Sequence, residues 1–171
     1  MKYLVSLLLS TVLMAQALFV SVATAADSPV EVKWLDLMPQ EDIDALENMP
    51  EITHDNPFDK SSMPEVMFSS KVVDTFENKN VRIAGYMVPL ETNNEGELTE
   101  FFLAPYMGAC IHVPPPPPNQ MIHVKFPEGA EVEGIWYPFI IEGKLKLETF
   151  DNGMGASSYS MTATLVKAYE E

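Results

Sequence analysis

NVRIAGYMVPLE, residues 80–91, alternates apolar with other side chains on either side of a single glycine. Val81 and Ile83 precede Gly85, and Tyr86 and Val88 follow it. A period of two is typical of a β-strand with one buried face. A glycine inside such a strand indicates a bulge or a bend, because it allows another part of the backbone to approach closely. We therefore expect a bent strand of the kind with which a small sheet curls on itself.

The pattern recurs along the rest of the chain. IIEGKLKLE, residues 140–148, again places a glycine among alternating apolar residues. Strand-like stretches follow one another about eight to twelve residues apart with no helical period between them, which favours an all-β fold. We predict a mostly β fold: a small OB-like barrel of about five to six strands, with a β-sandwich as the alternative. The further predicted strands are residues 98–106, 109–113, 120–126 and 157–169.

Residues 26–70 have no steady period, and we interpret them as an N-terminal arm that wraps a barrel domain of residues 71–171. Trp34 and Leu35 are the expected apolar anchors of a short extended piece. Pro39, followed by Glu41 and Asp42, predicts the start of one short helix, because proline and acidic residues are favoured in the first turn.

The first residues have the layout of a secretory signal peptide. Lys2 precedes an apolar run over residues 3–22, and Ala23-Thr24-Ala25 offers small side chains at a cleavage site. We expect residues 1–25 to be removed and the mature protein to be periplasmic, with no stable membrane insertion after cleavage. A permanent anchor is the alternative, since the run is nearly long enough to span a bilayer.

The charge of the chain restricts its partners. There are 25 acidic residues against 10 lysines and arginines, a formal net charge of −15. Such a chain repels phosphate backbones and anionic lipid, so we expect no nucleic-acid partner. A single cysteine excludes an intramolecular disulfide, and stability must come from packing.

That cysteine lies in GACIHVPPPPPNQ, residues 108–120. In a strand, Cys110 and His112 would point to the same face, and His123 on the next strand could approach them. A thiolate and two imidazoles suit zinc, and copper less well, so Cys110, His112 and His123 are the predicted metal ligands. Cys110 could instead be a buried structural residue. A thiol-dependent enzyme using Cys110 with His112 is a further alternative to a binding protein.

The five prolines form a stiff extended rod that cannot pair as a strand. We expect this rod to lie outside the sheet and, with the two amides after it, to form an exposed binding rim beside Cys110. One alternative is that the prolines form a stiff plug over one end of the barrel, and another is a protein–protein adaptor that presents the rod to an aromatic groove. The predicted binding residues are Pro114, Pro115, Pro116, Pro117, Pro118, Asn119 and Gln120.

VRIAGYMVPLE (81–91) and FFLAPYMGACIHVPPPPPNQMI (101–122) resemble the signature of the exported bacterial proteins of the DUF3299 family, a domain of unknown function. The resemblance extends over residues 34–169, and its signature also includes Gly85 and Pro89. It implies a periplasmic protein or lipoprotein with no established enzymatic activity. It also implies an association with ABC-type transporters or metal-uptake systems, with zinc as the suggested metal. This chain lacks the lipobox cysteine of the lipoprotein members.

Overall fold

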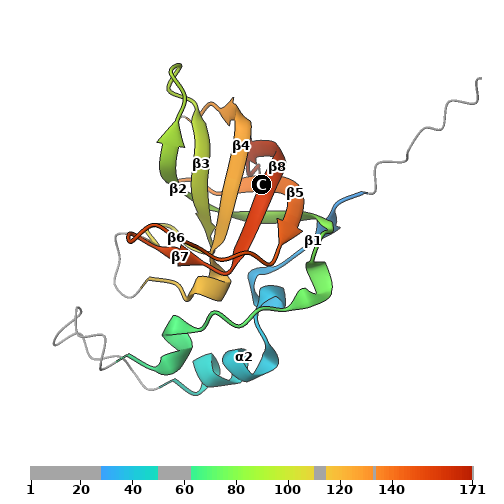
Figure 1. Cartoon of the computed structure of the whole chain (residues 1–171), viewed down its shortest axis with the longest axis vertical. Helices are drawn as coiled ribbons and strands as arrows, with labels where there is room; N and C mark the ends of the chain where they lie inside the picture. The colour runs from blue at the N-terminus through green and yellow to red at the C-terminus, as the bar shows by residue number, and fades with distance from the viewer. Residues whose placement is uncertain (1–27, 50–62, 110–114, 133, 171) are drawn as a thin grey trace, which may run out of the picture.

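The computed structural model describes residues 28–49, 63–109, 115–132 and 134–170. In chain order the elements are β1 (Val30–Glu31), η2 (Trp34–Leu37), α2 (Gln40–Glu47), η4 (Glu65–Phe68), η5 (Asp74–Phe76), β2 (Asn80–Thr92), β3 (Leu98–Ala104), η6 (Pro118–Gln120), β4 (Ile122–Ala130), β5 (Phe139–Lys146), β6 (Phe150–Asp151), β7 (Ala156–Ser157) and β8 (Tyr159–Ala168). Figure 1 shows α2 and the short η helices gathered at one end of the strands.

Five strands close into a barrel in the order β2-β3-β4-β8-β5, with β5 returning to β2. All neighbouring strands are antiparallel except β4 and β8, which are parallel. The short β1 adds to β2 in parallel. The predicted small OB-like barrel is confirmed, and the β-sandwich alternative is wrong because β2 joins the two ends of one sheet.

The long strand β2 is shared between two partners. Its first half, up to Gly85, pairs with β5, and its second half pairs with β3. The alternation continues through the glycine without a change of phase, so Met87 is buried and Tyr86 and Val88 point outward. The sequence analysis counted Tyr86 and Val88, rather than Met87, as the alternating apolar residues after the glycine. The ladder shifts only later, between Pro89 and Thr92.

Gly85 is nevertheless needed where it lies. A Cβ there would be 2.8 Å from the carbonyl oxygen of Ala104 and 2.9 Å from Cζ2 of Trp34. The Trp34 ring crosses β2 at this point, and its Nε1 donates to the carbonyl of Ala84 at 2.8 Å. The glycine therefore permits the close approach that the sequence indicates.

The arm closes one end of the barrel. Its helix α2 confirms the short helix predicted after Pro39. Leu35 is not an anchor, since 57% of it is exposed, whereas Leu37 is completely buried in the main core. The η2 turn explains the difference, because it directs Leu37 rather than Leu35 into the barrel end. Among the described residues, no helix has the length and apolarity to cross a membrane.

Tyr159 ties the arm to the barrel from inside. Its hydroxyl donates to the carbonyl of Leu37 at 2.8 Å and accepts from the amide of Val73 at 2.7 Å. Burial raises the pKa of Tyr159, and this effect outweighs the opposite effect of the Val73 backbone bond. The phenol thus stays protonated and keeps donating at neutral pH.

Candidate functional site

The strand register aligns a row of side chains across the outside of the barrel. His123 on β4 lies beside Phe102 on β3 and beside Ser160 on β8, and Ser160 lies beside Lys146 on β5. Because strand side chains alternate between faces, the side chains of this row point away from the main core inside the barrel. The surface is therefore assembled from four strands that are far apart in the sequence.

His123 is the centre of this surface. It is only 4% exposed, and its Nε2 lies 2.6 Å from Oε1 of Glu100. A carboxylate accepts hydrogen bonds, so in this pairing the imidazole carries its proton on Nε2. Oε2 of Glu100 lies 4.0 Å from Nζ of Lys125. Glu100 thus fixes the imidazole and also faces a lysine.

Two aromatic rings hold the imidazole in place. Phe150 stacks on His123 with ring centroids 3.7 Å apart and planes 5° from parallel. Phe102 lies edge-on to His123, with ring centroids 6.0 Å apart, and is tilted against Phe150, with ring centroids 5.7 Å apart. Since Phe150 belongs to β6, the β6–β7 hairpin is packed over the end of this face through a small apolar cluster with Phe102.

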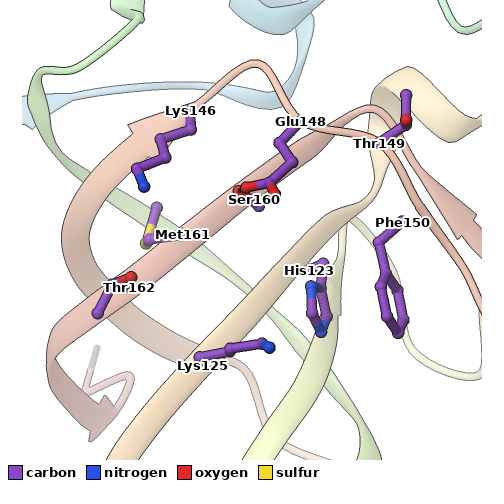
Figure 2. Close-up of a pocket in the computed structure, with 9 residues that line it drawn as sticks. All are labelled: His123, Lys125, Lys146, Glu148, Thr149, Phe150, Ser160, Met161 and Thr162. Atoms are coloured by element: carbon purple, nitrogen blue, oxygen red, sulfur yellow. Dashed lines mark hydrogen bonds between the residues drawn. The ribbon is translucent and has the colours of Figure 1, made fainter.

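A pocket of about 250 Å³ opens next to His123. Figure 2 shows the stacked rings of His123 and Phe150 on one side of it and side chains of β5 and β8 on the other. Ser160 Oγ donates to Glu148 Oε2 at 2.8 Å within the pocket wall. The lining residues are His123, Lys125, Lys146, Glu148, Thr149, Phe150, Ser160, Met161 and Thr162.

The pocket brings two lysines together beside one glutamate, Glu148, on an acidic chain. Lys125 and Lys146 are both exposed and both line the pocket. Lys144, two residues before Lys146, is exposed on the same outward face of β5. Three of the chain's ten lysines and arginines thus lie on one side of the barrel. Ammonium groups, hydroxyls and a flat ring pair together offer hydrogen bonds to an anion and a stacking surface for a planar group.

Of the predicted metal ligands, only His123 lies in the described part of the chain. Cys110 and His112 fall outside the described residues, so their approach to His123 stays a prediction. Within the described ranges, no group of three or more histidine, cysteine, aspartate or glutamate side chains is arranged to hold a metal ion. What the structure adds is the Glu100 partner of His123.

The two predicted rim amides lie inside the protein. Asn119 is fully buried, and its Nδ2 donates to Oδ2 of Asp42 at 2.8 Å and to the carbonyl of Lys71 at 3.0 Å. Gln120 is 7% exposed, and its Nε2 donates to the carbonyl of Trp34 at 2.8 Å. The expected exposure of these amides is not observed, because both donate hydrogen bonds to acceptors on the N-terminal arm.

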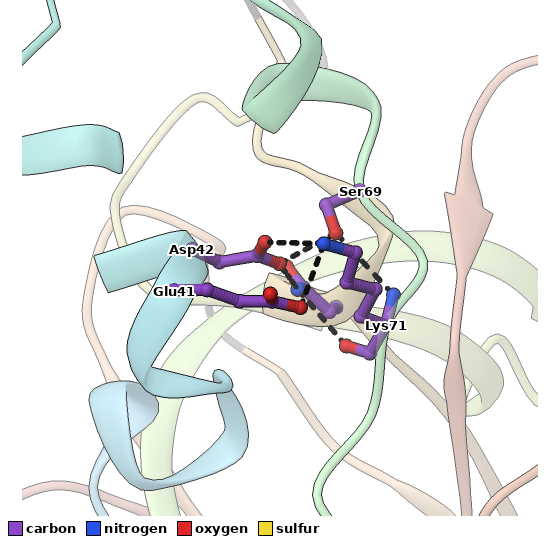
Figure 3. A network of polar contacts seen from close by, with 5 residues as sticks. Glu41, Asp42, Ser69 and Lys71 are labelled. Atoms are coloured by element: carbon purple, nitrogen blue, oxygen red, sulfur yellow. Dashed lines mark hydrogen bonds and ion pairs between the residues drawn. The ribbon is translucent and has the colours of Figure 1, made fainter. Parts of the chain in front are cut away.

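Asp42 is the acceptor at the centre of these arm contacts (Figure 3). It is 4% exposed and also accepts from Ser69 Oγ at 2.5 Å, while Nζ of Lys71 lies 3.6 Å from its other oxygen. Lys71 binds the exposed Glu41 more closely, at 2.7 Å. We call the arm latch the set of hydrogen bonds that Asn119 and Gln120 donate to Asp42 and to the carbonyls of Lys71 and Trp34, together with the contacts of Ser69 and Lys71 with Asp42. A buried carboxylate is stable only with such partners.

The proline run is partly packed. Pro114 lies outside the described residues, and Pro115 is exposed, but Pro116 and Pro117 are buried. Pro118 begins the η6 turn, and its carbonyl accepts from the amide of Ser158 at 2.8 Å. Residues 115–118 lie outside the sheet as predicted, but Pro116 and Pro117 pack against the barrel end and are not exposed.

Sequence reasoning missed Glu100, Lys125, Lys146 and Phe150. A partial signal is present, because spacing by two places Glu100 with Phe102, and His123 with Lys125, on single strand faces. Only the register between β3 and β4 shows that these two faces are one surface.

Comparison with known proteins places this chain among relatives. No curated protein matches it. A crystal structure of a DUF3299 family protein from Pseudomonas aeruginosa PAO1 is similar, with a TM-score of 0.70 and 34% sequence identity over 85% of this chain and 99% of that one. The family model for DUF3299, described as a protein of unknown function, matches residues 34–168. This chain belongs to the DUF3299 family.

Proposed function

We propose that this protein is an exported, periplasmic binding protein rather than an enzyme, and that it holds a small anionic ligand in the His123 pocket. The supporting observation is that two lysines, Lys125 and Lys146, line one pocket of a chain with 25 acidic residues, while the one carboxylate of the lining, Glu148, already accepts from Ser160. A pocket of about 250 Å³ suits a ligand smaller than a drug-sized molecule. Export rests on the leader-like residues 1–25. A role beside an ABC-type transporter rests on the family resemblance.

The place of the pocket supports the proposal by analogy of fold. OB barrels bind their ligands on the face of their second and third strands and at the loop between the fourth and fifth. Those elements correspond to β3, β4 and the connection from β5 to β8, which carry Glu100, His123 and Phe150. Fold alone does not assign function, and the ligand class follows from the side chains that line the pocket.

Truncating the two pocket lysines is expected to weaken anion binding. Inorganic phosphate, citrate and glucuronate are the probes, measured by isothermal titration calorimetry. Each of Lys125→Ala and Lys146→Ala should weaken the best probe by about tenfold, because a charge-assisted hydrogen bond contributes about 1.5–3 kcal/mol. Binding should also weaken with added salt, since the lysines are exposed.

Lys167→Ala is the matched control, because Lys167 is an exposed lysine of β8 that does not line the pocket. It should leave the affinity unchanged. If none of the three anions binds, or if the double lysine variant binds as well as the wild type, the anion proposal is wrong.

Zinc is a second candidate ligand, favoured by the Glu100–His123 pair. A histidine that ligates a metal usually donates its other ring N–H to a carboxylate, which is the relation of His123 Nε2 to Glu100. Among the described residues no hydrogen bond engages Nδ1 of His123. Cys110 and His112 lie in the connection between β3 and β4, the strands that carry this pair. Copper fits less well, because the methionines are scattered.

The zinc candidate predicts roughly stoichiometric binding that weakens as the pH falls, because protons compete with the metal for imidazole and thiolate ligands. His123→Ala and Cys110→Ala should each reduce the zinc content of protein purified from the periplasm, measured by mass spectrometry. Zinc that remains stoichiometric in the double variant would contradict this assignment, and so would the absence of zinc from the wild type.

A further inference from the structure

The second half of β2 has one edge that no described strand covers. β2 pairs with β5 only from Asn80 to Gly85, because β5 begins at Phe139 opposite that glycine. Beyond Gly85, β2 pairs with β3 on its other side, and this part is the outermost strand beside β3 in Figure 1. Within the described chain, no backbone hydrogen bond joins residues 86–89 to a segment other than β3.

A small apolar groove of about 60 Å³ runs along this edge. Successive side chains of a strand point to opposite faces, so a groove lined by four consecutive residues must follow the edge of the strand. Its lining shares no residue with the His123 pocket. The groove is lined by Tyr86, Met87, Val88 and Pro89 of β2, by Met107 and Gly108 after β3, and by Ile135 and Trp136 before β5.

Large apolar side chains are exposed around the groove. Trp136 is 60% exposed, and Met107 and Ile135 are 48% and 37% exposed. The other tryptophan, Trp34, is instead part-buried and hydrogen-bonded. Strand addition needs an unpaired strand edge, whose main-chain hydrogen bonds provide affinity, and a neighbouring pocket, which provides specificity. Solvent-exposed apolar side chains beside such an edge are typical of a binding site.

We infer that the edge of β2 at residues 86–88, which no described strand covers, binds an extended peptide segment of a partner protein as an added strand, together with the Trp136 groove. The segment places one apolar side chain in the groove against Trp136. Basic residues flank it, because the chain carries a net charge of −15 and the exposed Glu91 follows the groove-lining residues on β2. This inference does not depend on the function proposed for the His123 pocket.

The local geometry favours a short peptide over a second copy of this chain. Pro89 has no N–H to donate, and the β2–β3 ladder shifts register between Pro89 and Thr92. Prolines and bulges on an edge strand prevent long edge-to-edge pairing. Two copies would also repel each other through their equal negative charges.

The test uses a synthetic library of fluorescein-labelled octapeptides with Lys-Arg at both ends and four central positions varied among Val, Ile, Leu, Pro, Thr and Tyr. Binding is read by fluorescence polarisation against the full mature protein. The best peptide should lose about tenfold in affinity with Trp136→Ala, equivalent to about 1.4 kcal/mol. It should lose at least as much when its central amides are N-methylated, because the side chains remain but the main-chain donors are removed.

Tyr137→Ala is the matched control. Tyr137 is the neighbouring aromatic residue and is 71% exposed, but it does not line the groove, so its removal should leave the affinity unchanged. Both variants should unfold at the wild-type temperature, because neither ring is buried. The inference is wrong if no library peptide binds, or if the N-methylated peptide or the Trp136→Ala variant binds as tightly as its parent. A wild-type dimer in sedimentation velocity that Trp136→Ala disperses would also overturn it, by showing that the occupant is a second copy.

Discussion

Replacing Gly143 by alanine is expected to lower the free energy of unfolding by about 3 kcal/mol. The new Cβ would meet the carbonyl oxygen of Thr162 and lie 2.8 Å from Cα of Ala163. Both are backbone atoms of β8, so no side-chain rotation relieves the contact. Moving the backbone instead disrupts the β5–β8 ladder, which shifts register between Glu142 and Gly143. Urea unfolding followed by circular dichroism measures the change.

Gly134→Ala is the control for this substitution. A Cβ at Gly134 would have Cδ1 of Trp136 as its nearest atom at 3.5 Å, which is an ordinary contact. The control should change the stability by no more than about 0.5 kcal/mol, as surface substitutions usually do. Equal stability of the two variants would show that β5 and β8 can move apart at Gly143 without loss of stability, and would contradict a close approach of the two backbones at this glycine.

The barrel could be predicted from the sequence because its signals are local. Alternation and glycine position are properties of single strands, and both β2 and β5 follow them. The phase after Gly85 could not be predicted, since Tyr86, Met87 and Val88 are three consecutive apolar residues and either phase buries one or two of them. Met87 packs into the main core, and this places Tyr86 and Val88 on the outer face.

The candidate site could be predicted only in part because it depends on register. His123 was singled out as a metal ligand, but its contact with Glu100 requires that β3 and β4 pair with Phe102 opposite His123. The connection between these strands is long, and its length does not fix that register. Phe150 enters from a separate hairpin, and nothing in its local sequence indicates a histidine partner.

The amides after the prolines were misjudged for a different reason. The expected rim included them because they adjoin the proline rod, and asparagine and glutamine are mostly exposed residue types. Asn119 and Gln120 are buried because donors on the barrel match acceptors on the arm, at Asp42 and at the carbonyl of Trp34. Such a match between distant segments has no local signature in the sequence.

Removing one of these donors is expected to loosen the arm. Asn119→Ala should lower the free energy of unfolding by about 2 kcal/mol, because a buried polar group that loses its partner costs about 1–3 kcal/mol. The substitution removes the hydrogen bonds to Asp42 and to the carbonyl of Lys71. The Ser69 hydroxyl and the Lys71 ammonium remain near Asp42, so the loss is smaller than for a carboxylate with no partner. Urea unfolding measures the loss, and limited proteolysis at neutral pH should cut the arm first.

Asn119→Asp separates loss of a donor from simple loss of packing. It keeps the size of the side chain but sets a second carboxylate against Asp42, so it should be less stable than Asn119→Ala at neutral pH and recover relative to it in acid. Asn48→Ala is the control, since Asn48 donates to the carbonyl of Asp44 at an exposed helix end and its loss should be nearly neutral. If Asn119→Ala is no less stable than Asn48→Ala, the arm latch adds nothing. Burial of Leu37 and the Tyr159 hydroxyl would then be sufficient to hold the arm on the barrel.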